Sequence, residues 1–105
     1  MTGPGIRVTI TRFVENYQPG IVECTFTDAH GAAHTFIVKV PYVTAEHLAA
    51  DSTYPANGSI ACRIIDGGDT LQTRRVLIID TDEPDGVESE GGITRFEVFA
   101  DQLTE

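Results

Sequence analysis

Residues 21–40 read IVECTFTDAHGAAHTFIVKV, and this stretch decides the fold class. Apolar and polar side chains alternate in its first and last seven residues, which is the period of a β-strand with one buried face. The residues between them, 28–33, are suited to a turn, and Gly31 can adopt a left-handed backbone there. The stretch therefore predicts a β-hairpin with Phe26 and Phe36 on its inner face.

Outside this hairpin, alternating or continuous apolar runs predict four further strands, at residues 6–14, 59–65, 71–80 and 93–100. In the second of these, Ile60, Cys62 and Ile64 share the inward face. The run Val76-Leu77-Ile78-Ile79 is apolar on both faces, as in a central strand. A tight turn is expected at Asp66-Gly67-Gly68-Asp69.

Residues 44–50 break the strand pattern and predict one short helix. Pro41 ends the strand before them, Thr44 can cap the helix, and Leu48 lies among alanines that favour helix. The predicted order is then β-β-β-α-β-β, which is the order of the OB-fold, with a sixth C-terminal strand added. We therefore expect a mainly β fold, a single small barrel domain over residues 1–105. An SH3-like barrel or a small sandwich would give a similar pattern.

Part of this sequence resembles a group of short, uncharacterised bacterial β-barrel proteins. The resemblance rests on the segments Gly20-Ile21-Val22-Glu23-Cys24, Asp28-Ala29-His30-Gly31, Lys39-Val40-Pro41 and Tyr54-Pro55. It covers most of the chain and implies a small β-barrel, but no mechanism.

Length and composition suit one ordinary globular domain of 105 residues, 41% of them apolar. The segment Met1–Gly5 has neither the basic nor the apolar part of a signal peptide, and no apolar run approaches the ~20 residues that cross a bilayer. We therefore expect a cytoplasmic protein with no membrane partner. Cys24 and Cys62 match no zinc spacing and lie in strands, so they are expected to be buried thiols.

Negative charge is concentrated in the C-terminal part of the chain. The protein has 16 acidic and 7 basic residues, a net charge of −9, and residues 66–105 hold eleven of the acids with three of the bases. Such a field repels nucleic acid and attracts basic partners. The expected outer face of the first hairpin also lacks an aromatic ring for stacking bases. We therefore predict no nucleic-acid binding, unless Phe13 and Phe99 are exposed.

The densest acidic segment is the predicted loop at residues 80–92. Its acids, which are the predicted binding residues, are Asp80, Asp82, Glu83, Asp85, Glu88 and Glu90. Three interpretations are open: a solvated connection, a docking surface for a basic protein, or a calcium site. The calcium interpretation is weakened because Pro84 stands where an EF-hand loop has its third ligand.

A catalytic centre has one candidate, formed by Asp28, His30 and His34 around the hairpin turn. An aspartate that orients a histidine is half of a catalytic arrangement, but these residues also suit a turn and a strand end. Cys24 lies mid-strand, where a reactive thiolate is not expected. We predict no catalytic residue, no metal site and no cofactor.

The leading hypothesis is a non-catalytic interaction domain with an acidic docking surface, for example an immunity-type protein that covers a basic nuclease site, or an accessory protein. The alternative is a small-ligand or calcium-binding barrel. A small enzyme, or a subunit that pairs through an edge strand, are further hypotheses. The sequence leaves the oligomeric state open.

Overall fold

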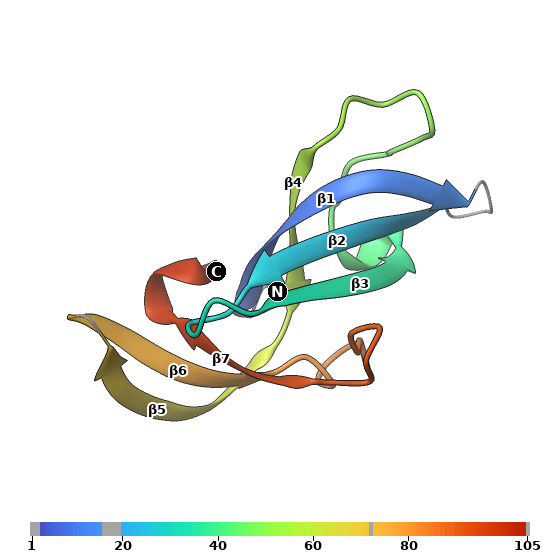
Figure 1. Ribbon diagram of the computed structural model, residues 1–105. Coiled ribbons are helices and arrows are strands. Elements are labelled where there is room, and N and C mark those ends of the chain that lie inside the picture. The colour runs from blue at the N-terminus through green and yellow to red at the C-terminus, as the bar shows by residue number, and fades with distance from the viewer. Residues whose placement is uncertain (1–2, 16–19, 72, 105) are drawn as a thin grey trace.

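The computed structural model describes residues 3–15, 20–71 and 73–104. These residues form a mainly β, compact domain of two antiparallel sheets (Figure 1). The elements are β1 (Gly5–Glu15), β2 (Ile21–Thr27), β3 (Ala33–Lys39), the 3-10 helix η1 (Val40–Tyr42), β4 (Ala56–Ala61), β5 (Arg63–Leu71), β6 (Arg74–Asp80), β7 (Arg95–Phe99), the 3-10 helix η2 (Ala100–Gln102) and β8 (Leu103–Thr104). The predicted fold class is confirmed at the level of a small, mainly β domain.

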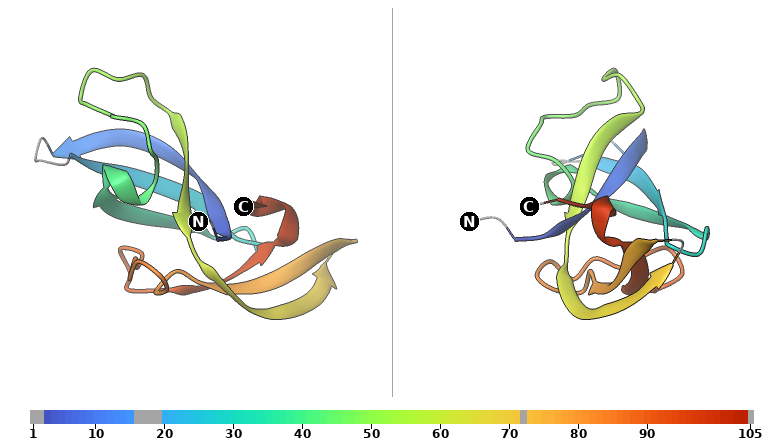
Figure 2. Two further views of the ribbon diagram at one scale, coloured as in Figure 1. Left: turned by 180° about the vertical axis from the view of Figure 1, so that it is seen from behind. Right: turned by 90° about the vertical axis from the view of Figure 1, so that its left-hand side faces the viewer.

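The larger sheet has the order β3-β2-β1-β4, and β8 pairs with the first two residues of β1. The smaller sheet has the order β5-β6-β7 and lies below the larger one in Figure 1; the views in Figure 2 show the same two layers. No strand pairing within the described ranges joins the two sheets into a closed barrel. The OB-like strand order is therefore wrong, and the strand count differs as well.

The core lies between the sheets and is built from the alternating faces that the sequence predicts. In β2, Val22, Cys24 and Phe26 are buried, and Phe36 of β3 faces them. The other buried apolar residues of this cluster are Ile6, Val8, Ile10, Val40, Val43, Ile60, Cys62, Ile79, Val87, Phe96 and Val98. Residues from both sheets and from the acidic loop thus share one core, whose burial from water stabilises the fold.

The first hairpin is confirmed closely. β2 and β3 pair from Ile21 with Lys39 to Thr27 with Ala33, and Gly31 in the turn has φ of 85°. β6 is also confirmed as a central strand, because it pairs with β5 on one side and β7 on the other.

The predicted helix at residues 44–50 is wrong. This segment is an irregular connection, and the only helical turn nearby is η1, which precedes it. Polar groups of this segment form local hydrogen bonds: the Thr44 hydroxyl accepts from the Glu46 amide, and the Ala49 carbonyl accepts from the Tyr54 hydroxyl. A seven-residue helix is too short to offset the cost of its own nucleation, so these side-chain bonds and the packing of Leu48 on the core decide the conformation.

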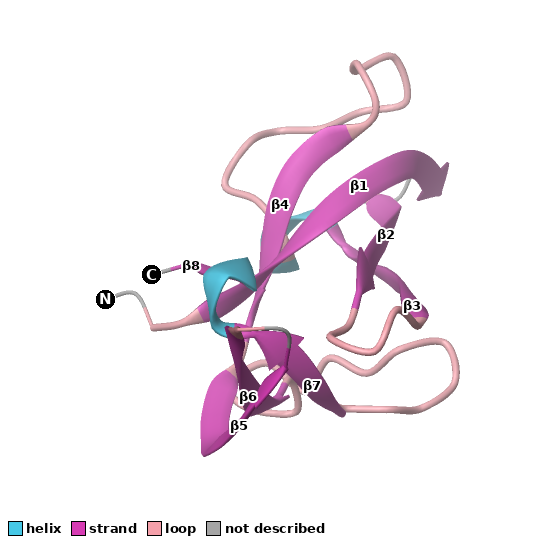
Figure 3. Ribbon diagram, turned by 60° about the vertical axis from the view of Figure 1, so that its left-hand side comes forward, coloured by secondary structure: helices cyan, strands magenta, loops and turns pink. Residues whose placement is uncertain are grey.

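The predicted strand at residues 59–65 is confirmed only in part: Ile60 and Cys62 are buried as predicted, but the chain divides the segment between β4 and β5. The predicted turn at 66–69 is wrong. The chain leaves the larger sheet after β4 and starts β5 at Arg63, with the buried Cys62 between them (Figure 3). Ile64, expected inside, is 44% exposed because this crossing changes which face the strand presents. Residues 66–69 lie within β5, and one of the two register shifts of this strand falls between Gly67 and Thr70. The chain turns only after Leu71, where Thr73 has φ of 65°.

Candidate functional site

The acidic loop lies between β6 and β7 and has a defined internal structure. Thr81 is fully buried, and its hydroxyl donates to the Val87 carbonyl at 2.7 Å. The Val87 amide donates back to the Thr81 carbonyl at 3.1 Å, and the Gly86 amide donates to the Asp82 carbonyl at 2.8 Å. The Val87 side chain is part of the core. The loop is therefore anchored at its centre as well as at its ends.

The loop is also attached to the larger sheet. The Glu90 amide donates to the Thr35 carbonyl of β3 at 2.8 Å. Close by in the chain, the Ile93 amide donates to the Ser89 hydroxyl at 3.1 Å. These bonds hold the loop below η1 and the edge of β3, as seen at the right of Figure 1.

Two of the six predicted binding acids have partners within the fold. Asp80 is buried; its Oδ1 accepts from the Asp82 amide at 2.8 Å, and its Oδ2 lies 3.5 Å from Nε of Arg95. The Asp82 amide is the main reason that the pKa of Asp80 lies below its ordinary value. Glu83 pairs with Arg63 of β5 at 3.1 Å. Both carboxylates are therefore paired within the protein, Asp80 in a buried position and Glu83 at the surface, where both side chains of its pair are more than half exposed.

The other four predicted acids are exposed and form no ion pair within the described ranges: Asp82, Asp85, Glu88 and Glu90. The structure thus divides the acidic loop into a paired set, the buried Asp80 and the exposed Glu83, and an outer set of four exposed acids without an ion pair. Only the outer set can meet a partner without first losing an internal bond.

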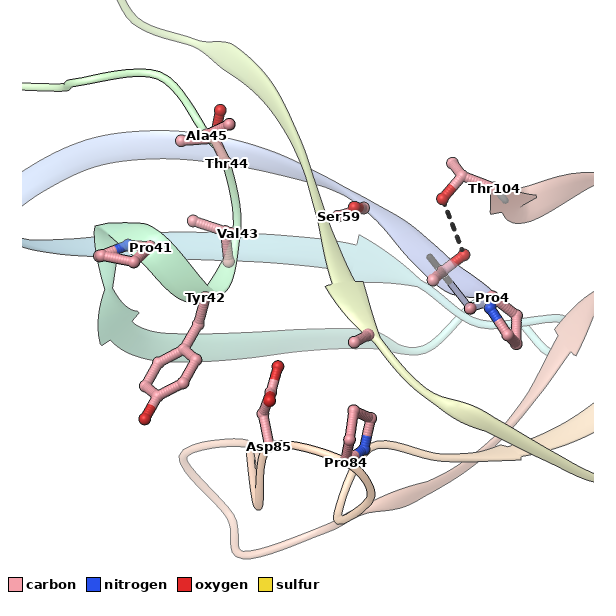
Figure 4. A pocket seen from close by; sticks show the side chains of 13 residues that line it. Pro4, Pro41, Tyr42, Val43, Thr44, Ala45, Ser59, Pro84, Asp85 and Thr104 are labelled. Atoms are coloured by element: carbon pink, nitrogen blue, oxygen red, sulfur yellow. Dashed lines mark hydrogen bonds between the residues drawn. The ribbon is translucent and has the colours of Figure 1, made fainter. Parts of the chain in front are cut away.

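A pocket of about 450 Å³ lies between this loop and η1 (Figure 4). Tyr42 and Asp85 extend into it from opposite sides, with Pro84 beside Asp85. The lining residues are Gly3, Pro4, Gly5, Pro41, Tyr42, Val43, Thr44, Ala45, Ser59, Ala61, Pro84, Asp85 and Thr104. Among the described residues that line this pocket, Asp85 is the one charged residue, and its charge is negative.

A second pocket, of about 400 Å³, lies on the other side of Tyr42. It shares Tyr42 and Asp85 with the first pocket and adds the charged residues Lys39 and Glu88. Sequence reasoning missed Tyr42, which is 43% exposed. The available signal was an aromatic residue directly after Pro41, beyond the end of the alternating strand.

The hairpin turn at the other end of β3 brings together the three residues of the predicted catalytic alternative. Asp28 Oδ2 lies 2.8 Å from Nε2 of His34, and Oδ1 accepts from the amides of His30 and Ala32 at 2.9 and 3.0 Å. Nε2 of His30 lies 3.1 Å from Oε1 of Glu97. Desolvation alone raises the pKa of Asp28, but the bonds from His34, Ala32 and His30 outweigh it, so the pKa is lowered.

The contacts of His34 indicate a structural role. Its ring packs against Phe26 and Phe96, with centroids 5.4 and 4.7 Å away. The Ala29 amide of the same turn donates to the Glu97 carbonyl of β7 at 2.8 Å, so the turn fastens the two sheets together. A pocket of about 280 Å³ beside it is lined by Asp28, His30, His34, Ile78, Ile93, Arg95, Phe96 and Glu97. Within the described chain, neither His30 nor His34 hydrogen-bonds a serine, threonine or cysteine that could act as nucleophile.

The cysteines are buried, as predicted. Burial raises the pKa of Cys24 to about 12, with a smaller effect of the Glu23 charge, and raises the pKa of Cys62 to about 11. Both thiols stay protonated near neutral pH and are poor nucleophiles. Over residues 3–15, 20–71 and 73–104, no three His, Cys, Asp or Glu side chains are grouped so that they could hold a metal ion. The calcium alternative therefore gains no ligand cluster in the acidic loop.

The aromatic rings of the first hairpin lie on its inner face, not on its outer face. Phe26 and Phe36 face the core, as predicted. The Phe99 ring is covered by the Arg74 guanidinium, which lies 3.6 Å from its centroid, and Phe13 packs against the core. Neither ring forms a free platform for a base.

Helices long and apolar enough to cross a membrane are absent from the part of the chain that the structure describes. The chain matches no known protein family, no curated protein and no solved structure. The resemblance to short bacterial β-barrel proteins therefore remains a prediction.

Proposed function

We propose that this protein is a non-catalytic interaction domain of the cytoplasm that binds a basic protein through the outer acids of the loop. The observation that carries the proposal is the division of the loop. Asp82, Asp85, Glu88 and Glu90 are exposed without internal ion pairs, on a backbone that Thr81 and Val87 hold in place. An ordered loop loses little conformational entropy when a partner binds, which favours affinity.

Net charge supports the same proposal. The protein carries −9, so the whole molecule attracts a basic partner before contact is made. Charges at the rim of an interface act mainly on the association rate and on its salt dependence. An immunity-type or accessory protein fits this description.

The test compares two variants with equal loss of charge. One carries Asp82→Asn, Glu88→Gln and Glu90→Gln; the control carries Glu46→Gln, Asp51→Asn and Asp66→Asn, all exposed positions outside the loop. A partner is first captured from native cells with the unchanged protein and identified, and the affinity of the purified pair is then measured at low and high salt.

We expect a basic partner whose binding weakens with salt. The loop variant should bind it about three- to tenfold more weakly, since exposed charge pairs contribute about 0.2–1 kcal/mol each. The control variant should bind nearly as well as the unchanged protein. Equal binding by both variants, or a partner that is not basic, would overturn the proposal.

A further inference from the structure

The pocket between η1 and the acidic loop combines features that match one kind of side chain. Its single charged lining residue is Asp85, which is exposed and forms no ion pair within the described ranges. The rings of Pro4, Pro41 and Pro84 provide apolar walls, and Tyr42 stands opposite Asp85 (Figure 4). A side chain with a cationic end and an apolar stem would contact Asp85 and Tyr42 with its charge and the proline rings with its stem.

The aromatic ring of Tyr42 and the carboxylate of Asp85 favour arginine over lysine. A guanidinium is planar and stacks on an aromatic face, whereas an ammonium is a compact, strongly hydrated charge. Arginine also carries five N–H donors. The side chain of Asp85 offers two carboxylate oxygens to those donors.

We propose that this pocket receives one arginine side chain of the partner protein, with its guanidinium between the Tyr42 ring and the Asp85 carboxylate. The inference rests on the proposed function for the source of the arginine. The adjoining pocket, with Lys39 and Glu88, continues past Tyr42 and gives room for the neighbouring residues of the same extended segment. Lys39 in the adjoining pocket would repel an arginine and suits an acidic or polar residue of the segment. The arginine is therefore placed in the first pocket, where Asp85 is the one charged residue among the described lining residues.

The test uses a defined probe, the capped tripeptide acetyl-Gly-Arg-Gly-amide, and its citrulline counterpart, which has nearly the same shape without the charge. Each is titrated at low salt into the full-length ¹⁵N-labelled protein, and amide resonances are followed by NMR. We expect the arginine peptide to shift resonances around Tyr42, Val43 and Asp85, and the citrulline peptide to have little effect.

Three variants complete the test. Tyr42→Leu and Asp85→Asn should each weaken binding of the arginine peptide by about two- to fivefold, the range for an exposed cation–π contact or ion pair. Asp66→Asn removes the same charge from an exposed position outside both pockets and should leave binding unchanged. All three positions are exposed, so the fold should survive, and the amide spectrum of each free variant checks this.

The inference is overturned if the citrulline peptide binds equally well, if the shifts spread evenly over the acidic surface, or if Tyr42→Leu and Asp85→Asn bind as the unchanged protein does. Its failure is distinguishable from failure of the proposed function, because the loop variant tested there keeps both Tyr42 and Asp85. If the loop variant no longer binds the protein partner, and the arginine peptide does not bind in the pocket, only the inference about the pocket is refuted. Arginine binding in the pocket, with no effect of the loop acids on any protein partner, would refute only the acidic docking surface.

Discussion

The hairpin turn at residues 28–33 and the acidic loop at residues 80–92 both use an aspartate to organise their backbone, but they differ in what happens to their remaining charges. At the hairpin turn, Asp28 pairs with His34, and His30 pairs with Glu97, so each of these side chains has a partner within the protein. At the loop, Asp80 and Glu83 are the only acids that form ion pairs with other described residues.

This difference separates charges that hold the structure from charges that are free to act on another molecule. A buried pair such as Asp28–His34 stabilises the protein, because removing one partner leaves the other buried and unpaired. Exposed pairs such as Glu83–Arg63 contribute little, because solvent screens them. Unpaired acids at the surface contribute little to stability and can be recruited by a partner. Substitutions at the paired and at the unpaired charges should therefore differ strongly in their effect on the free energy of unfolding.

Asp28→Ala should cause the largest loss of stability. The change removes the acceptor for two backbone amides and the partner of His34, whose side chain is only 15% exposed. We expect the free energy of unfolding to fall by about 2–4 kcal/mol, measured by urea denaturation. Asp51→Ala, at an exposed position, serves as the control. A loss for Asp28→Ala no larger than that of the control would show that the hairpin charges are not structural.

Thr81→Val should destabilise the protein by about 1–2 kcal/mol, because a buried hydrogen bond is lost while the shape of the side chain is kept. The Val87 carbonyl loses its 2.7 Å donor. Hydrogen exchange should also become faster at the Gly86 and Val87 amides. Thr9→Val, on the exposed face of β1, is the control. Unchanged exchange at these amides would mean that Thr81 does not hold the loop.

Acid should weaken the hairpin through Asp28. Its pKa is lower in the folded protein than in the unfolded chain, so its contribution to stability is complete above the unfolded pKa of about 3.9 and disappears as the pH falls through the folded value. Unfolding of the unchanged protein and of Asp28→Asn should be compared from about pH 7 to about pH 3. The difference in free energy of unfolding between the unchanged protein and Asp28→Asn should become smaller as the pH falls. A difference that does not change with pH would contradict the lowered pKa of Asp28.

His30→Ala should cost no more than about 1 kcal/mol, because the pair with Glu97 is more than half exposed on both sides and screened by solvent. Thermal unfolding at low and high salt would measure this, and salt should reduce the already small effect. A loss as large as that of Asp28→Ala would show that this surface pair is as important as the buried one.

The loop variant with Asp82→Asn, Glu88→Gln and Glu90→Gln should change stability by less than about 0.5 kcal/mol, the usual range at surface positions without partners. Mutual repulsion among the acids makes a small gain the expected direction. Urea denaturation measures it, and a loss above about 1 kcal/mol would mean that these acids have structural partners after all.

Patterns among neighbouring residues of the sequence correctly predicted the strands and the turn whose conformation depends mainly on those residues. The alternation in β1, β2 and β3 fixed which side chains are buried, Gly31 marked the turn, and the apolar run in β6 marked a central strand. The helix at residues 44–50 and the turn at residues 66–69 were mispredicted because the local preferences of Ala-rich and Gly-rich segments are weak. Tertiary contacts outweigh such preferences and decide the conformation of these segments.

The candidate site was predictable only in part. The sequence located all six acids of the loop, and a dense acidic segment is visible without any structure. Which of them are open could not be read from the sequence, because the cations that neutralise Asp80 and Glu83 come from β7 and β5. The pocket with Tyr42 was equally hidden, since η1 and the loop are some forty residues apart in the chain and meet only across the two sheets.

By itself, then, the sequence determined a small, acidic, mainly β domain with buried thiols and one exposed acidic segment, because strand period, composition and charge are properties of neighbouring residues. The tertiary structure alone decided that the strands form two sheets, that the turn of Asp28 fastens them through the bond from the Ala29 amide to the Glu97 carbonyl, and that Asp85 and Tyr42 line one pocket. Those features arise where distant segments pack together, and packing depends on the whole chain.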